Sequence, residues 1–504
     1  MSVAPIEVSG GPREFAVLQE ISPSVAIGIL CAAQILLWTI APTIANDALP
    51  LDVVENGAWG PEWLLSSYKN PALSSWCLEL IRLATGSLGW PAYLVSQLFV
   101  SATFALVFLL GKEAMGASRA LAGTLLLTGV YYFSWPTPEF NQDVAQMPLW
   151  AGLALSLWRA TETNRWIWWL LLALFGAASL YAKLSSSVLP IAAAAWMLAD
   201  VQARRTLAGS RPWMMLGLFL LLIAPLLRWL IDNDFAPGAY AIARGATHSF
   251  SGAGFVLAQA EAAAPVIVIL WLAGLLGALS ASRHRERNRR LGAYLLTLTI
   301  IPILLCILTA GVAGTGARRM WGVPMLNLVG LLAIWLTSSR FTHKALEQIE
   351  IAAAALLITL PIGYVTATTL SPELGYVKRQ NWPQTEIATR MRDLWTQSTG
   401  QPLRIVAGDA TNWLSGLIAV SCCERPPSLF TDADHVRSPW ITNERLTREG
   451  ALVVWTDRGG GLSQRLADLI GSRPRQVARF SIPGVPAAAP IDVHYSIIQP
   501  RVGQ

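Results

Sequence analysis

The first hydrophobic segment reads SVAIGILCAAQILLWTIAPTI over residues 24–44, and an acidic stretch, ANDALPLDVVE, follows it directly at 45–55. The hydrophobic segment has no charged residue and is long enough to cross about 30 Å of hydrocarbon. The whole chain of 504 residues is 54% hydrophobic and only 13% charged, with 22 Trp, which is too apolar for a soluble enzyme. The sequence therefore predicts a polytopic membrane protein with acids beside its first span.

Apolar windows of similar length recur along the chain, and we expect about eleven transmembrane helices. They lie near 24–44, 91–111, 118–134, 141–158, 166–182, 187–203, 213–231, 263–281, 292–313, 320–338 and 347–367.

Basic residues predict the orientation of these spans. If the N-terminus is cytoplasmic and the spans alternate, the inner loops hold most of the positive charge, as the positive-inside rule requires. These inner residues are Lys112, Arg119, Arg159, Arg165, Arg204, Arg205, Arg211, the run from Arg283 to Arg290, Arg340 and Lys344. The net charge of +6 is then a topology signal, and we expect no nucleic-acid partner.

The character of the chain changes near residue 370, where apolar runs shorten to strand length and charges become frequent. Helical patterns near 384–398, 410–419 and 461–470 alternate with apolar runs at 404–408, 451–455 and 491–498, which indicates α/β packing. The predicted fold is an all-α polytopic membrane bundle over 1–370 with a small extracytoplasmic α/β domain over 371–504. In a Gram-negative cell that domain is periplasmic.

Two outer segments of the bundle precede this domain. The first, at 45–90, contains a predicted amphipathic helix from Pro71 to Thr85, of the kind that lies on a membrane surface. The second, at 232–262, is rich in small residues and is either a mobile flap over a site or an ordinary flexible loop. His248 lies in it, and with no second His nearby we do not expect it to bind a metal.

Asp47 is the acid closest to the first span. At the membrane plane it can act as a general base on an acceptor hydroxyl, or it can be a solvated cap residue. Asp52 and Glu55 lie farther along the loop, and we expect them to be solvated or structural.

The segment TPEFNQD at 137–143 predicts a helix start, with Thr137 as N-cap, Pro138 at the first position and Glu139 in the first turn. Glu139 is either catalytic or a partner of the helix dipole. Asp143 is deeper in the span, where an ionisable group is costly and indicates function, the alternative being a hydrogen-bonded structural acid.

Basic residues on the outer side of the bundle oppose the topology rule and need an explanation, which a lipid phosphate would supply. The candidates for binding a donor phosphate are Lys69, Lys183, Arg318 and Arg319. For Lys183 and the two arginines the alternative is that the side chain reaches into the headgroups.

The sequence contains no motif of three other common enzyme classes. There is no Walker loop, no GxSxG and no HExxH, so ATP hydrolysis, serine hydrolysis and zinc proteolysis are not supported. Five cysteines occur without a CxxC pair, and a disulfide between Cys77 and one of the adjacent Cys422 and Cys423 stays open.

The order of these motifs over residues 20–370 resembles the GT-C type membrane glycosyltransferases, in the bacterial branch related to protein O-mannosyltransferases and the lipid A aminoarabinose transferase. The resemblance is carried by Asp47 and by the segments YKNPAL at 68–73, PEFNQD at 138–143, YAK at 181–183 and RRMWGVP at 318–324. Asn70 and Ala72 depart from the commoner His and second Pro of the family.

The resemblance implies an activity and its partners. Such enzymes move a sugar from a polyprenyl-phosphate carrier to an acceptor at the outer face of the bacterial inner membrane, by an inverting displacement. The implied acceptor is lipopolysaccharide core or lipid A, with a protein acceptor as the alternative. Carried over, Asp47 is the family's acid after the first span, Lys69 is the lysine of its Lys-His-Pro-Pro type segment, and Asp143 is the acid of its Phe-Asn-x-Asp segment. With Glu139, Asp47 and Asp143 make up the candidate catalytic acids. No cofactor is implied with certainty, and a divalent metal stays open.

Two other classes share some of these features. A transporter or flippase of lipid-linked sugars predicts repeats or matching broken helices in two halves, and we find neither in the sequence. A membrane scaffold whose outer domain binds a partner does not need acids at the membrane face.

Overall fold

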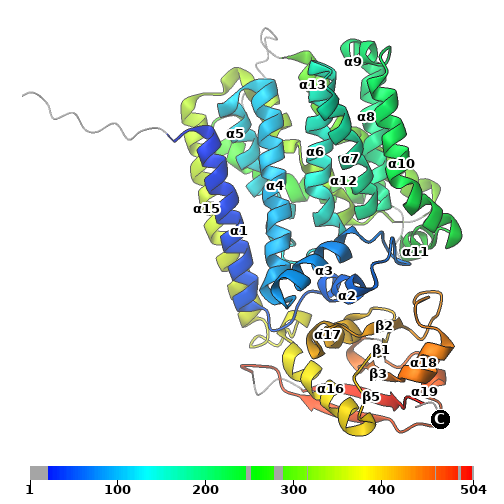
Figure 1. Ribbon diagram of the computed structural model, residues 1–504. Helices are drawn as coiled ribbons and strands as arrows, with labels where there is room; N and C mark the ends of the chain where they lie inside the picture. The colour runs from blue at the N-terminus through cyan, green and yellow to red at the C-terminus, as the bar shows by residue number, and fades with distance from the viewer. Residues whose placement is uncertain are drawn as a thin grey trace, which may run out of the picture.

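The computed structural model describes residues 21–245, 251–276, 288–314, 316–459, 461–485 and 490–501. It has two parts, a bundle of helices and a smaller unit with a β-sheet, which packs against one end of the bundle (Figure 1). We call this end of the bundle the sheet end. The predicted helical bundle with a small C-terminal α/β unit is confirmed, and the proposed boundary at 370/371 stays a prediction.

The helices of the bundle are long and roughly parallel (Figure 1). They are α1 Pro23–Ala45, α4 Gly89–Met115, α5 Ala117–Leu125, α6 Gln142–Thr163, α7 Trp166–Ala182, α8 Val188–Ala199, α9 Val201–Thr206, α10 Arg211–Asp232, α12 Gly252–Leu272, α13 Arg289–Val312, α14 Val329–Thr337 and α15 His343–Leu370. Three further helices lie toward the sheet end, α2 Leu51–Trp59, α3 Leu73–Thr85 and α11 Ala236–Gly245.

Each of the eleven predicted windows contains helix in its described residues. By length and composition alone, α1, α4, α10, α12, α13 and α15 are able to cross a membrane. A seventh span results if the bent pair at 319–340, with 56° between its halves, counts as one. The chain is a multi-pass membrane protein, and eleven spans stay a prediction.

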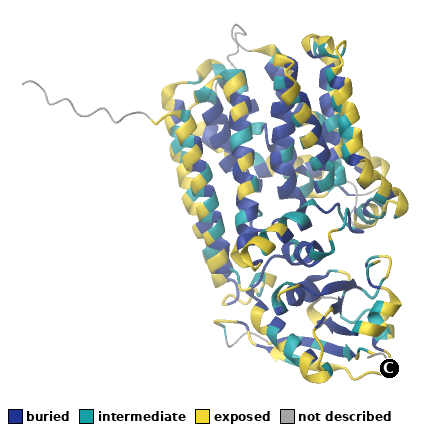
Figure 2. Cartoon of the chain, in the orientation of Figure 1, coloured by how far each residue is buried: buried dark blue, intermediate teal, exposed yellow. Residues whose placement is uncertain are grey.

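Burial differs between the centre and the edge of the bundle (Figure 2). The most apolar window of α4 is 61% buried, whereas those of α10 and α15 are only 17% and 22% buried. The exposed side chains of these outer helices include Leu221, Ile231 and Ile362. An apolar outer surface around a central helix is the arrangement that lipid requires.

The predicted inner basic residues gather at the end of the bundle opposite the sheet. The end of α4, the starts of α5, α10, α13 and α15, and α9 all lie there (Figure 1). Arg290 holds this end together, since its Nε lies 3.1 Å from both carboxylate oxygens of Asp200 and its guanidinium lies over Trp158 and Trp196. Residues 283–287 of the predicted basic run lie outside the described residues.

The outer segments confirm one prediction and correct another. The predicted amphipathic helix is α3, which buries Ser74, Ser75 and Glu79 and leaves Leu80 and Leu83 exposed. Leu78 is buried on the same side, and the exposed leucines suit a membrane surface. The prediction of a loop at 232–262 was wrong for its described residues, because they form α11 and the start of α12. His248 lies outside the described residues.

The C-terminal unit is built on one five-stranded sheet, in the order β2-β1-β3-β5-β4. Strands β1, β2 and β3 are parallel, and β5 pairs antiparallel with both β3 and β4. Its elements are α16 Gln384–Thr399, β1 Ile405–Gly408, α17 Trp413–Cys422, β2 Ser428–Thr431, α18 Asn443–Glu449, β3 Ala451–Trp455, α19 Gln464–Ile470, β4 Gln476–Phe480 and β5 Ile491–Ile498. The three helices and three strands predicted from sequence are present, and β2, α18 and β4 were missed.

Hydrogen bonds join the C-terminal unit to the first outer segment. The backbone N–H groups of Asp47 and Ala48 donate to the carbonyl of Gln380, and Leu49 N–H donates to Gln384 Oε1 at 2.7 Å. Helix α17 packs directly on α2, and a side chain at Gly416 would meet Val54 at 3.2 Å. These contacts fix the acidic segment between the bundle and the sheet.

Candidate functional site

Five polar residues from three segments meet where α2, α6 and the end of α7 come together. We call Asp52, Glu139, Asn141, Asp143 and Lys183 the acid cluster. Glu139 and Asp143 were predicted as catalytic acids and Lys183 as a phosphate ligand, so the fold brings three candidate residues to one place. Asp52 and Asn141 were not among the candidates.

Asn141 organises the acid cluster from the start of α6. Its side-chain oxygen accepts from the N–H groups of Asp143 and Val144 at 3.0 and 3.1 Å, which makes it the N-cap. Its Nδ2 donates to Asp52 Oδ2 at 3.0 Å. The predicted helix start at Thr137 and Pro138 was therefore wrong, because α6 begins four residues later, at Gln142.

Glu139 stabilises a different helix from the predicted one. Its Oε1 accepts from the N–H of Asp52 at 3.0 Å, in the first turn of α2, whose N-cap Pro50 has no side-chain acceptor. Burial and then the neighbouring Asp52 carboxylate raise the pKa of Glu139 to about 8, although the Asp52 N–H and Arg379 act in the opposite sense. Glu139 is thus an acid that can hold or release a proton near neutral pH.

Asp143 and Lys183 form a mostly enclosed ion pair at the ends of α6 and α7 that lie toward the sheet end. The Lys183 Nζ lies 2.6 Å from Asp143 Oδ1, and the two side chains are 15% and 11% exposed. Lys183 is the C-cap residue of α7, and Gln146 Nε2 also donates to Asp143 Oδ1 at 3.4 Å. Arg318 lies within electrostatic range of Asp143 and is exposed. The acid cluster therefore has three carboxyl groups and one internal lysine, with the exposed Arg318 within electrostatic range.

Lys69 lies in a separate, closed environment. It forms an ion pair with the buried Glu55, and its Nζ lies 5.6–5.9 Å from the ring centroids of Trp59, Tyr68 and Tyr240. We call these five residues the Lys69 cage. Burial opposes the charge of Lys69, but Glu55 and the neighbouring phenols outweigh it and raise the pKa of the lysine. Lys69 already has a matching charge, and its role toward phosphate stays a prediction.

The C-terminal unit completes the Lys69 cage. Asn412, the N-cap residue of α17, donates from Nδ2 to Glu55 Oε1 at 2.7 Å. Arg437 lies over the ring of Tyr68, with 5.6 Å from its guanidinium carbon to the ring centroid. Glu55 is therefore buried and paired rather than solvated. Of the two roles expected for it, the structural one fits.

Asp47 and Arg319 lie apart from both groups. Asp47 is exposed beside the C-terminal unit, and its carboxylate has no hydrogen bond or ion pair to any described residue. Arg319 lies 3.7 Å from Glu261 and over the ring of Tyr131, whereas Arg318 has neither contact in the described ranges.

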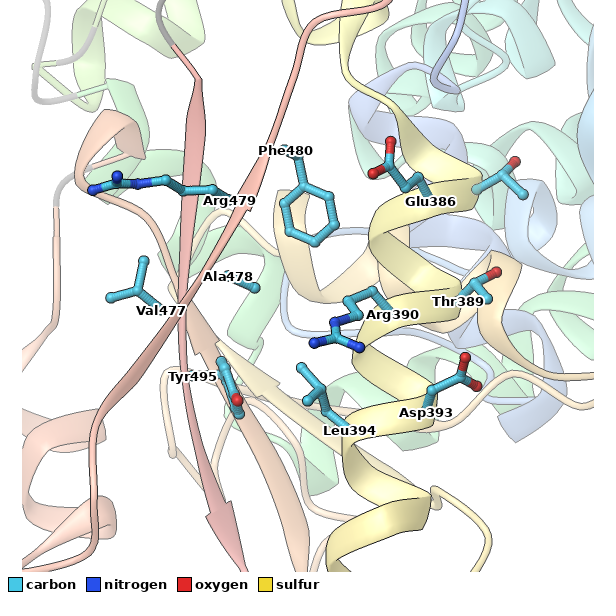
Figure 3. A pocket seen from close by; sticks show the side chains of 11 residues that line it. Glu386, Thr389, Arg390, Asp393, Leu394, Val477, Ala478, Arg479, Phe480 and Tyr495 are labelled. Atoms are coloured by element: carbon cyan, nitrogen blue, oxygen red, sulfur yellow. The ribbon is translucent and has the colours of Figure 1, made fainter.

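Metal binding and pockets give no further candidate site. Among the described residues, no three His, Cys, Asp or Glu side chains are placed to hold a metal ion. A groove of about 730 Å³ lies between α16 and the β4–β5 hairpin, lined by residues such as Arg390, Phe480 and Tyr495 (Figure 3). It shares no residue with the acid cluster or with the Lys69 cage.

Comparison with known proteins bears on the fold. A family model described as dolichyl-phosphate-mannose-protein mannosyltransferase matches residues 69–229. The structure of ArnT from Cupriavidus metallidurans bound to undecaprenyl phosphate matches with a TM-score of 0.65 at 11% identity, over 94% of this chain and 98% of that one. The chain has a GT-C type fold. The resemblance expected from the sequence is thereby confirmed.

Two further solved structures match this GT-C type chain, one about as well and one less well. The apo structure of the same ArnT matches with a TM-score of 0.63 at 11% identity, over 94% of this chain and 98% of that one. The archaeal oligosaccharyltransferase AglB from Archaeoglobus fulgidus matches with a TM-score of 0.47 at 9% identity, over 95% of this chain and 74% of that one. No curated protein matches the sequence significantly.

Proposed function

We propose that this protein is a glycosyltransferase that moves a sugar from a polyprenyl-phosphate carrier to lipopolysaccharide core or lipid A at the outer face of the bacterial inner membrane. The observation that carries the proposal is the acid cluster, which lies toward the sheet end of a GT-C type bundle with exposed arginine at its edge. The solved ArnT of the same fold is bound to undecaprenyl phosphate, which favours a carrier of this kind.

The donor phosphate needs cations that are not already neutralised. Lys183 is paired with Asp143, and Lys69 is paired with Glu55. We therefore assign the first contact with phosphate to Arg318, an exposed residue within electrostatic range of Asp143. Lys183 adds positive potential behind it, and Lys69 would reach the phosphate only after leaving Glu55.

The acceptor hydroxyl needs a base on the opposite side of the sugar from the leaving phosphate. Asp47 is an exposed carboxylate that follows α1, and Glu139 is a carboxyl group whose pKa is raised to about 8. We propose that one of them takes the proton from the acceptor while the carrier phosphate leaves in a single inverting displacement. Asp143 holds Lys183 in place for this step.

Mass spectrometry of lipopolysaccharide and lipid A tests this function directly. We would compare wild type, a deletion strain and strains with Asp47→Asn or Glu139→Gln at matched expression. The proposal predicts that the deletion removes one sugar mass and that at least one of the two variants does the same. A deletion profile identical to wild type contradicts the glycolipid acceptor. Loss of a sugar from a secreted glycoprotein in that strain would instead identify a protein acceptor.

A further inference from the structure

Two adjacent cysteines in the C-terminal unit are in unusually close contact. The Sγ atoms of Cys422 and Cys423 lie 2.6 Å apart, at the end of α17. Non-bonded heavy atoms pack at about 3.5–4.0 Å, so this separation is much shorter than an ordinary contact. Cys422 is buried, whereas Cys423 is partly exposed, and so a reagent from solution can reach the pair.

We propose that Cys422 and Cys423 form a redox site that closes to a disulfide between neighbouring residues. Its oxidant is the disulfide of a small thiol compound or of a protein. The Cys423 thiolate attacks one sulfur of the oxidant and releases one thiol. The Cys422 sulfur then attacks the mixed disulfide and releases the second. The two cysteine protons and two electrons end on the two released thiols, and one S–S bond replaces another.

Basic groups around the pair favour the attacking thiolate. Arg392 donates from its guanidinium to the carbonyl of Cys422 at 3.2 Å, and Arg404 also acts on Cys423. The hydrogen bond from the Cys422 thiol lowers the pKa of Cys423, and the two arginines add to this against the effect of burial. The partly exposed sulfur is therefore the nucleophile and the buried one resolves the mixed disulfide.

The position of the pair gives its redox state a structural consequence. On one side, Ser421 Oγ accepts from Gln384, whose Oε1 receives the N–H of Leu49. On the other side, the carbonyl of Glu424 accepts from Arg82 of α3 at 2.9 Å. The disulfide would fix the chain between two contacts that hold the C-terminal unit to the bundle.

Mass spectrometry of the full chain tests this site. We would purify the protein in detergent without reductant, expose it to oxidised glutathione, denature it in N-ethylmaleimide and digest it with trypsin. The peptide at 405–437 contains both cysteines and no others, because Pro426 protects Arg425 from cleavage. We expect this peptide to be lighter by two hydrogen atoms and unlabelled, and to take up two labels after reduction. Cys77 is the internal control and should be labelled without reduction.

Two results would overturn the site. One is double labelling of the peptide without reduction after the oxidant. The other is a stable glutathione adduct on Cys423, which would show that Cys422 does not resolve it. The Cys422→Ser variant is the matched control, and it should keep exactly that adduct on Cys423. The outcome is independent of the sugar transfer proposed above.

Discussion

The acid cluster and the Lys69 cage each hold a lysine paired with a carboxylate, but they differ in what surrounds the pair. In the acid cluster, Lys183 and Asp143 adjoin two more carboxyl groups, and Arg318 is exposed at the edge. In the Lys69 cage, three aromatic rings and Asn412 enclose one balanced ion pair. The unbalanced charge of the acid cluster, with an exposed arginine in range, is typical of a catalytic site. The balanced and enclosed ion pair of the Lys69 cage is typical of a contact that joins two segments.

Removing the charge of Asp143 should have the largest effect on activity. Asp143→Asn removes the carboxylate that pairs with Lys183, so the lysine is no longer held in the acid cluster. We expect the rate of sugar transfer to fall by about 10²–10⁴-fold. A transfer assay with a polyprenyl-phosphate sugar measures this. The matched control is Asp232→Asn, which breaks an exposed ion pair with Arg228 and should leave the rate nearly unchanged.

Breaking the Lys69 cage on one side should mainly affect stability. Lys69→Met leaves Glu55 buried and unpaired, and we expect a loss of about 3–5 kcal/mol in the free energy of unfolding. Adding Glu55→Gln removes the unpaired charge and should restore most of that loss in a thermal melt. A double variant no more stable than the single one would show that Glu55 is not the partner that matters.

Glu139 should make stability depend on pH. Its pKa of about 8 in the folded protein exceeds the ordinary value of 4.5, so the folded state holds a proton that the unfolded state has released. The stabilisation from this group is present below the ordinary pKa and is lost as pH rises through about 8. We expect the melting temperature of the wild type to decrease as the pH rises from 4.5 to about 8. The melting temperature of Glu139→Gln should decrease less over the same range. An equal decrease in both proteins would refute the raised pKa of this acid.

Asn412→Ala should give the smallest of these effects. It removes one hydrogen bond to a buried carboxylate, which is worth about 1–3 kcal/mol. The loss should appear in the stability of the C-terminal unit, measured by hydrogen exchange over β1 and α17, while the acid cluster keeps its rate of transfer. A large fall in rate would show that the two groups are coupled through α17.

The sequence predicted elements better than it predicted contacts. Long apolar windows indicate helices because lipid demands them, and short apolar runs indicated three of the five strands of the C-terminal sheet. The missed strand β4 has mostly exposed residues, so it lacks the apolar run that indicated the others. The missed strand β2 is as short as β1 but has only two apolar residues, Leu429 and Phe430, between Ser428 and Thr431.

The candidate site was only partly predictable for a related reason. Asp143 and Lys183 were each singled out as ionisable groups at the membrane, but their pairing across 40 positions depends on the packing of α6 against α7. Asp52 was judged solvated or structural because it lies farther along the loop from the first span than Asp47. Glu139 was a catalytic candidate, with the alternative that it complements the dipole of its own helix. Asn141 has the better side chain for that position, so Glu139 is free to bind the N–H of Asp52 instead.

Neutralising each ion pair as a unit tests the contrast between the two groups most directly. We would measure sugar transfer by the Asp143→Asn/Lys183→Met and Glu55→Gln/Lys69→Met double variants, after thermal melts confirm that both are folded. The account predicts a loss of about 10²-fold or more for the first variant and less than about 10-fold for the second. A greater loss in the second variant would contradict it and would place the donor phosphate on Lys69.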